Sequence, residues 1–311
     1  MAAAVGHEVA AITNLGDGWP SRLTVTTSTG DRPVAAHLSK TSSHNRKDYE
    51  WRFQNPANSQ AVEEPEGHKP LLIGIDETTG QQILVVVDGT SRVGRTARFS
   101  ILFNHRIVQE ASQNGWSQYT SNTGEQIFAL RPRLLPALLE MLDNHVIIPT
   151  AQVSDAAKAA GVIEENDAES GERARRTISS YVRDAAFSKK VKQAYGHRCA
   201  MCGLKLGLLA GAHIYPVSAP GSEDEVWNGV PLCHNHHAAY DAHQLWFDNE
   251  YRIHIKPEFL AAAHDDESSR RFIDQTLSEL IVPEQAESRP RGAMIKARRD
   301  YYPLEYDWLP N

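Results

Sequence analysis

Three cysteines and one histidine are spaced as two metal-binding pairs in the C-terminal half of this chain. Cys199-x2-Cys202 forms the first pair, and Cys233-x2-His236 follows after thirty intervening residues. Zn²⁺ in structural sites takes four thiolate or imidazole donors in a tetrahedron, and two short loops commonly supply a pair each. These residues use every cysteine of the chain. We therefore predict a structural zinc site at Cys199, Cys202, Cys233 and His236, whose loss unfolds the surrounding domain.

A second series of polar residues is interleaved with these four. His213 is followed by Asn228 after fourteen intervening residues, by His237 after eight more, and by Asp241 after a further three. Two such patterns within about forty-five residues are much harder to obtain by chance than either pattern alone. The combination is therefore specific enough to compare with known families.

The segment from about residue 175 to 256 resembles the HNH endonucleases, whose active site is a hairpin followed by a helix, the ββα-metal motif. The matching stretches are Ala212–Pro216, Asn228–Cys233, His236-His237 and Tyr240-Asp241. One position departs from the family pattern. Many members carry an acidic residue or a second histidine, as a metal ligand, where this chain has Ala212. The resemblance implies a phosphodiester hydrolase in which that ligand is absent or comes from elsewhere.

Phosphodiester hydrolysis needs a deprotonated water in line with the leaving oxygen, and positive charge to stabilise the transition state. Following the resemblance, we expect His213 to be the general base, because a neutral imidazole near pH 7 can accept a proton from water. His237 and Asp241 lie one helical turn apart and are expected to hold one divalent ion, Mg²⁺ or Mn²⁺. Asn228 is expected to brace the loop beside His213, with direct metal contact left open.

Each of these residues has a structural alternative. A lone histidine on an apolar strand, such as His213, is more often a hydrogen-bonded core residue, and Asp241 could instead pair with a cation such as Arg252. The adjacent His236 and His237 could also exchange their roles. Aligning Cys233 with the family favours His236 on the zinc and His237 at the catalytic ion.

A basic run leads into this motif, although the net charge of the whole chain is −7. Between residues 173 and 205 the one acidic residue is Asp184. Clustered Lys and Arg residues suit a phosphate backbone, which attracts them independently of base sequence. The alternative is a solvated helix face. We expect DNA contacts from Arg173, Arg175, Arg176, Arg183, Lys189, Lys190 and Lys192.

A length of 311 residues allows two domains. Residues 1–148 alternate short runs rich in Val, Ile, Thr and aromatics with turn residues, which predicts a β-rich domain. Its expected strands are 22–27, 49–53, 71–75, 82–87, 98–103 and 127–130, and its expected helices are 104–113 and 134–142. Residues 149–171 are small and polar, and are expected to be a linker.

Residues 172–311 are expected to form the nuclease domain with a C-terminal extension. Its expected elements are a helix over 172–194, a hairpin of 206–214 and 230–232, a helix over 235–243, a second hairpin of 245–248 and 251–255, and a helix over 268–280. We expect the tail to pack back onto this domain. Its basic residues are either DNA contacts or solvated surface: Arg289, Arg291, Lys296, Arg298 and Arg299. The predicted fold class is α+β, a β-rich domain followed by a zinc-clipped ββα-metal domain.

The N-terminal domain contains no Walker loop, no GxGxxG and no PD-(D/E)xK arrangement. Aromatic and basic residues that include Trp19, Tyr49 and Trp51 could form a surface that reads or flips a base. Trp51 and Phe53 are equally suited to a hydrophobic core. A β-rich module before a C-terminal HNH nuclease resembles the layout of restriction enzymes, including those that depend on a modified base.

We therefore expect a metal-dependent endonuclease that restricts foreign double-stranded DNA, with dependence on modified bases and a homodimeric state left open. An HNH nuclease of a repair or mobile-element system, and a non-catalytic zinc module that binds nucleic acid, are the alternatives. No apolar run approaches the length of a membrane span, and the N-terminal MAAAVGHEVAA lacks the features of a signal peptide. Three cysteines at metal-ligand spacing suit a reducing compartment. These features predict a cytoplasmic protein without membrane partners.

Overall fold

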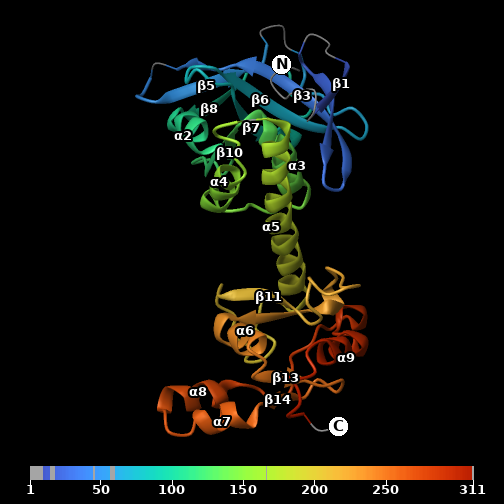
Figure 1. Cartoon of the computed structure of the whole chain (residues 1–311). Coiled ribbons are helices and arrows are strands. Elements are labelled where there is room, and N and C mark those ends of the chain that lie inside the picture. The colour runs from blue at the N-terminus through green and yellow to red at the C-terminus, as the bar shows by residue number, and fades with distance from the viewer. Residues whose placement is uncertain (1–9, 15–17, 45, 57–59, 166, 310–311) are drawn as a thin grey trace. The chain divides into compact units, whose positions relative to one another are not determined.

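Two compact units make up the chain, residues 1–182 and residues 183–311. The computed structural model describes residues 10–14, 18–44, 46–56, 60–165 and 167–309 (Figure 1). Residues 1–9, on which the prediction about a signal peptide rests, lie outside the described residues. The mixed composition of strands and helices confirms the predicted α+β class.

A seven-stranded sheet forms the centre of the N-terminal unit. In spatial order its strands are β1 (Ala10–Asn14), β2 (Ser21–Thr27), β3 (Gly30–Lys40), β6 (Lys69–Asp76), β7 (Ile83–Asp88), β10 (Gln126–Leu130) and β9 (Trp116–Thr120). β3 and β6 pair in parallel, and the other neighbours are antiparallel. A smaller sheet contains β4 (Ser42–Ser43), β5 (Glu50–Gln54) and β8 (Ser100–Asn104). The predicted strands are confirmed, whereas β1, β3, β4 and β9 were not predicted.

Helices α2 (Arg106–Asn114), α3 (Leu135–Asp143) and α4 (Thr150–Ala159) pack against the large sheet (Figure 1). Two short 3₁₀ turns, η1 (Thr90–Arg92) and η2 (Pro132–Leu134), lie between strands and helices. α2 ends where predicted, because Gly115 adopts φ 81° and accepts the left-handed conformation of a helix C-cap. The strands bury continuous apolar runs such as Ile83–Val87.

The structure differs from the linker expected over residues 149–171. This segment contains α4, whose Val153 and Ala157 are fully buried. The Ser154 hydroxyl donates a hydrogen bond of 3.2 Å to the carbonyl of Trp116 in β9. Small residues allow this close packing. A segment whose composition is typical of a linker therefore forms a helix that packs on the sheet. The next helix, α5 (Ala168–Ala194), spans the boundary between the two units at residues 182 and 183.

The nuclease-like unit is built around a hairpin of β11 (Leu209–His213) and β12 (Gly229–Cys233), followed by α6 (His234–Asp241). Two glycines let the hairpin approach the last turns of α5. A Cβ at Gly211 would lie 2.7 Å from the Ser188 Cα atom, and a Cβ at Gly229 would lie 2.5 Å from Val191 Cγ2. The hairpin therefore lies between the end of α5 and α6 (Figure 1). This order of elements is the one predicted.

The remaining elements follow in chain order: β13 (Leu245–Phe247) paired with β14 (Ile253–Ile255), α7 (Pro257–Ala262), α8 (Glu267–Gln275), the 3₁₀ turn η4 (Ala286–Ser288) and α9 (Gly292–Tyr301). Ile295, Tyr306 and Leu309 are buried in the same core as the hairpin, so the tail packs back onto this unit as predicted. A further 3₁₀ turn, η3 (Val226–Asn228), precedes β12. No helix in the described ranges is long and apolar enough to cross a membrane.

Candidate active site and metal centre

The four predicted zinc ligands converge in the C-terminal unit. The ligand atoms of Cys199, Cys202, Cys233 and His236 all lie within 4.8 Å of one another. A tetrahedral ion with metal–sulfur bonds of about 2.3 Å would set its sulfur atoms about 3.8 Å apart. The Sγ atoms of Cys202 and Cys233 are 3.9 Å apart. The donor set and its spacing fit zinc, and four protein donors leave no open position for catalysis.

The electrostatics of the three thiols also fit a bound cation. The pKa of Cys202 is raised to about 12, first by burial and then by its thiol neighbours. Burial also raises the pKa of Cys233. Burial acts to raise the pKa of Cys199 too, but hydrogen bonds, led by the one with His236, outweigh it and lower that pKa to about 6. Three thiols this close oppose one another's ionisation, and a divalent ion would remove that opposition.

Thr276 selects which nitrogen of His236 faces the thiols. Its hydroxyl donates to the carbonyl of Phe272 at 2.9 Å, so it accepts from His236 Nε2 at 3.0 Å. The proton is then on Nε2, and the lone pair on Nδ1 lies 3.1 Å from Cys233 Sγ. Hydrogen bonds of this kind fix the orientation of metal-binding histidines. The geometry places His236, rather than His237, with the cysteines.

His213 stands at the end of β11, with its side chain 15% exposed. The ring stacks on Phe187 of α5, with centroids 3.7 Å apart and planes 5° from parallel. Its Nε2 atom lies 2.8 Å from Oδ1 of Asp224, in the loop between the two strands. The histidine is therefore held by its face and by one edge, and is accessible to solvent only in part.

Asn228 is fully buried and its side-chain amide is completely engaged. Oδ1 accepts from the backbone N–H of Tyr215 at 2.8 Å. Nδ2 donates to the carbonyls of Tyr215 and Glu223 and to the hydroxyl of Ser222, at 3.1, 3.0 and 3.2 Å. The amide thus ties the chain just after His213 to the far end of the loop. This geometry is that of a brace.

His237 and Asp241 lie on α6, with His237 Nε2 3.3 Å from Asp241 Oδ2. Both side chains reach solvent, being 29% and 62% exposed. Within the described residues the Cys₃His set is the one group of three or more His, Cys, Asp or Glu side chains that converges. His237 and Asp241 are therefore a two-donor site. Mg²⁺ keeps several waters and needs only one or two protein ligands besides substrate phosphate, so the pair fits such an ion.

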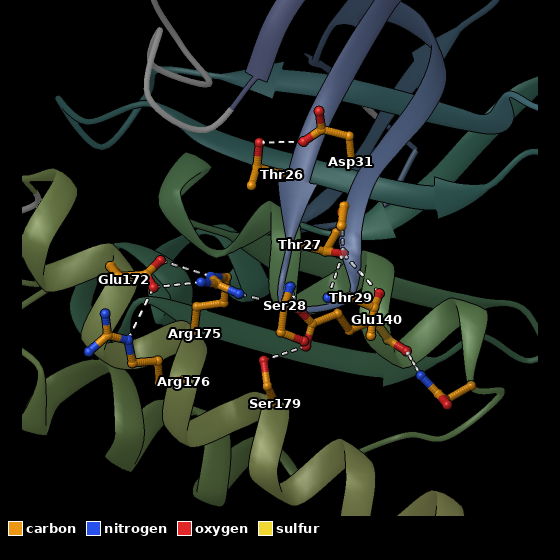
Figure 2. A network of polar contacts seen from close by, with 12 residues as sticks. Thr26, Thr27, Ser28, Thr29, Asp31, Glu140, Glu172, Arg175, Arg176 and Ser179 are labelled. Atoms are coloured by element: carbon orange, nitrogen blue, oxygen red, sulfur yellow. Dashed lines mark hydrogen bonds and ion pairs between the residues drawn. The ribbon is translucent and has the colours of Figure 1, made fainter.

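The first part of the basic run is engaged by carboxylates from outside it. Arg175 contacts Glu172 through two hydrogen bonds, the Nε bond being 2.9 Å, and Arg176 contacts the same carboxylate at 3.1 Å. Arg175 also lies 3.7 Å from Glu140. Figure 2 shows both arginines directed toward Glu172, with Glu140 joining the Ser28 backbone to the Ser179 hydroxyl. The acid that neutralises these arginines comes from Glu172 and from α3.

Arg173 is held similarly, by the carbonyl of Ala160 at 2.8 Å and by Glu169 at 3.0 Å. In the C-terminal unit, Arg183 lies 3.3 Å from Asp224. Lys190 is exposed, and Lys189 and Lys192 are half-buried. The arginines before residue 183 are therefore paired with carboxylates of the N-terminal unit, whereas Arg183 is paired with Asp224 of the C-terminal unit.

The expected aromatic surface of the N-terminal unit is only partly exposed. Trp19 is 4% exposed and Phe53 is 2% exposed, so both belong to the core, and the interpretation of Trp19 as a surface residue was wrong. Trp51 is half-buried and stacks on His105, with ring centroids 3.9 Å apart. His105 in turn lies 3.2 Å from the buried carboxylate of Asp76.

Sequence reasoning missed three residues that shape the C-terminal unit. Asp224 was not among the expected site residues, although it lies four residues before Asn228. Thr276 has no recognisable pattern around it. Arg298 was grouped with basic residues expected to be either DNA contacts or solvated surface, but it is 4% exposed. Its guanidinium donates to Tyr306 Oη at 2.6 Å and to the carbonyls of Ile214 and Tyr240 at 3.2 and 3.0 Å, so it holds the tail to the core.

Comparison with known proteins agrees with this geometry. Residues 199–248 match the family described as HNH endonuclease, and residues 34–139 match the family described as Methylase-associated X1. No curated protein matches the chain. A similar solved structure is described as "Modification dependent TagI restriction endonuclease"; it is 15% identical with a TM-score of 0.30, and the match covers 93% of this chain and 85% of that one. The C-terminal unit contains an HNH endonuclease domain, which makes the protein a nuclease.

Proposed function

We propose that this protein is a restriction-type endonuclease that hydrolyses phosphodiester bonds in double-stranded DNA. The observation that carries the proposal is the arrangement of His213 and the His237–Asp241 pair on a hairpin and the helix that follows it, within the segment that matches the HNH endonucleases. The Cys₃His group supports it, because the zinc would hold the hairpin and helix together beside this site.

Each residue has a task in the proposed reaction. His213 accepts a proton from the attacking water, whose oxygen forms the new bond to phosphorus while the bond to the leaving oxygen breaks. Asn228 fixes the chain that follows His213, so the base stays at the end of its strand. His237 and Asp241 would hold Mg²⁺ or Mn²⁺, which when bound supplies positive charge to the phosphate and the leaving oxygen.

The part of the basic run from Arg183 onward is proposed to contact the DNA backbone. Arg183, Lys189, Lys190 and Lys192 belong to the same unit as the catalytic residues. Phosphate contacts position a protein on DNA and carry little sequence information. Target selection is therefore assigned to the N-terminal domain, proposed as residues 1–148, and phosphodiester cleavage to the nuclease domain, proposed as residues 172–311. The segment between them contributes α4, which packs on the N-terminal sheet.

The description of the N-terminal family as methylase-associated supports a version in which this domain reads the methylation state of DNA. A cavity of about 550 Å³ in the N-terminal unit is lined by Lys47, Tyr49, Leu102 and Tyr119, among others. Tyr49 is 46% exposed, and the guanidinium of Arg106 lies 4.4 Å from its ring centroid. An aromatic face beside polar groups suits an unstacked base.

The experiment incubates the full chain with unmodified and methylated plasmids of one sequence, in Mg²⁺ or Mn²⁺, with His213→Ala as the inactive control. We expect cleavage that needs the divalent ion, differs between the two plasmids and falls 10²- to 10⁴-fold in the control. Tyr49→Ala should change the preference between plasmids without slowing cleavage of both. Equal cleavage of the two would point to a repair or mobile-element nuclease. Binding without cleavage of any DNA would indicate a non-catalytic module and overturn the proposal.

A further inference from the structure

His213 has one nitrogen engaged and one open. Nε2 lies 2.8 Å from Asp224 Oδ1, and Nδ1 has no hydrogen-bond partner among the described residues. A carboxylate at neutral pH is only an acceptor, so the nitrogen that faces it must carry the proton. The neutral ring is thereby held with its lone pair on Nδ1.

We propose that Asp224 is a positioning residue for the general base His213. This inference rests on the proposed role of His213. Nδ1 would accept the proton of the attacking water, and the imidazolium so formed would keep its Nε2–H bond to the carboxylate, which stabilises its charge. The same division of labour between carboxylate and imidazole operates in Ser-His-Asp triads. After the phosphodiester bond breaks, the proton on Nδ1 passes to solvent and the base is restored.

Asp224 is itself oriented by α5. Its second oxygen, Oδ2, lies 3.3 Å from Arg183 Nε, and Arg183 also lies 3.8 Å from Asp184. Arg183 is 52% exposed, so this ion pair adds little to stability. Its effect is geometric, because it directs Oδ1 toward the histidine. Phe187, one helical turn further along α5, fixes the plane of the same ring.

The carboxylate beside His213 does not come from Ala212. That residue is 3% exposed and packs in the core, so a carboxylate cannot come from the strand position before His213. The loop between the strands supplies one instead. Both oxygens of Asp224 already have partners, and in the part of the chain that the structure describes no third metal-binding side chain converges with Asp224 and His213. The carboxylate therefore serves the histidine rather than a metal ion.

The test compares Asp224→Ala, His213→Ala and the double variant in the full chain, with Glu225→Ala as matched control. Glu225 is an exposed carboxylate next in the same loop. We expect Asp224→Ala to lower kcat about a hundredfold, a loss typical of a misplaced catalytic group, with KM, DNA affinity and metal requirement unchanged. The double variant should be no slower than His213→Ala, because Asp224 acts only through His213. Glu225→Ala should cut normally.

A second readout is the tautomer of His213, measured by ¹⁵N NMR of histidine-labelled protein and assigned by difference from His213→Ala. The native chain should show Nε2–H, and Asp224→Asn should shift the proton toward Nδ1 and lose activity although the side chain keeps its size. Normal cutting by Asp224→Ala, with His213→Ala inactive, would overturn the inference and leave the proposed function standing. A double variant slower than His213→Ala, or a raised Mg²⁺ requirement, would show that Asp224 acts directly and also overturn it. Normal cutting by His213→Ala would instead refute the proposed base.

Discussion

Asn228→Asp distinguishes the two roles considered for Asn228, a brace of the loop and a ligand of the divalent ion, because each role predicts a different result. The substitution keeps the shape of the side chain and the acceptor that binds the Tyr215 N–H. It replaces the donating Nδ2 with a second oxygen, which then faces the carbonyls of Tyr215 and Glu223 and the hydroxyl of Ser222. That hydroxyl already donates to the Tyr215 carbonyl, so it cannot compensate without giving up its own bond.

The cost follows from these contacts. The two N–H bonds of the amide contribute about 1 kcal/mol each. A buried carboxylate facing two carbonyl oxygens adds at least about 2 kcal/mol more, since neither its desolvation nor that of the carbonyls is offset. The total is about 4 kcal/mol or more at neutral pH. For a unit of this size that lowers Tm by roughly 15 °C, out of a stability that is typically about 5–15 kcal/mol.

Calorimetry of the full chain would measure this loss in the transition of the C-terminal unit, alongside plasmid cleavage at a temperature where both proteins are folded. Asn249→Asp is the matched control, since Asn249 is exposed in the same unit and should tolerate the added charge. If Asn228 contacted the divalent ion, a carboxylate would bind it at least as well as the amide. An Asn228→Asp protein with native Tm and lower Mg²⁺ requirement would refute the brace.

Four further outcomes are expected. Removing zinc with a chelator should unfold the C-terminal unit, as measured by circular dichroism. Thr276→Val should lower the zinc affinity 10- to 100-fold in a chelator competition, because the Nε2–H of His236 loses its acceptor. An unchanged zinc affinity in Thr276→Val would contradict that contact. His37 is buried with Nδ1 facing the Leu71 carbonyl and Nε2 accepting from the Glu63 N–H, and burial lowers its pKa from 6.5 to about 4. As the pH falls, His37 therefore becomes protonated in the unfolded chain before it does in the folded chain. The free energy of unfolding should then decrease as the pH falls from 6.5 toward 4. His37→Gln should reduce this pH dependence, as measured by urea titrations. Arg298→Leu should lower Tm through loss of three buried hydrogen bonds while leaving the salt dependence of DNA affinity unchanged; a reduced salt slope would return Arg298 to the DNA contacts.

The features that could be predicted from the sequence are those that depend on residues close together in the chain. Cys199 and Cys202 are close in sequence, and so are Cys233 and His236. A short turn is enough to bring the two members of each pair together, so only the packing of the two loops against each other depends on the rest of the fold. The hairpin and helix around His213 and His237 followed from strand and helix patterns of ordinary length. β3 was not predicted, because Gly30 and Pro33 are residue types typical of turns, yet Pro33 is accommodated opposite Thr24 in the sheet.

Polar contacts between residues far apart in the sequence could not be predicted, for a physical reason. Thr276 contacts a residue 40 positions away, and Arg298 contacts one 84 positions away. Neither residue type nor spacing indicates such a contact before the core is assembled. The carboxylate partners of the arginines at 173, 175 and 176 could not be predicted for the same reason, since Glu172 lies just outside the basic run and Glu140 lies in another helix. A charge count along the chain does not report the charge around a side chain in the fold.

The first turns of α6 place His236 among the cysteines and His237, the next residue, at the proposed catalytic ion. If zinc occupies the Cys₃His group as proposed, the two histidines make cleavage conditional on the order of maturation. His237 would then reach its position only after His236 has bound the metal, and the metal-free chain would be inactive. Zinc binding at His236 would then control when the nuclease becomes active, because both histidines lie on the same helix.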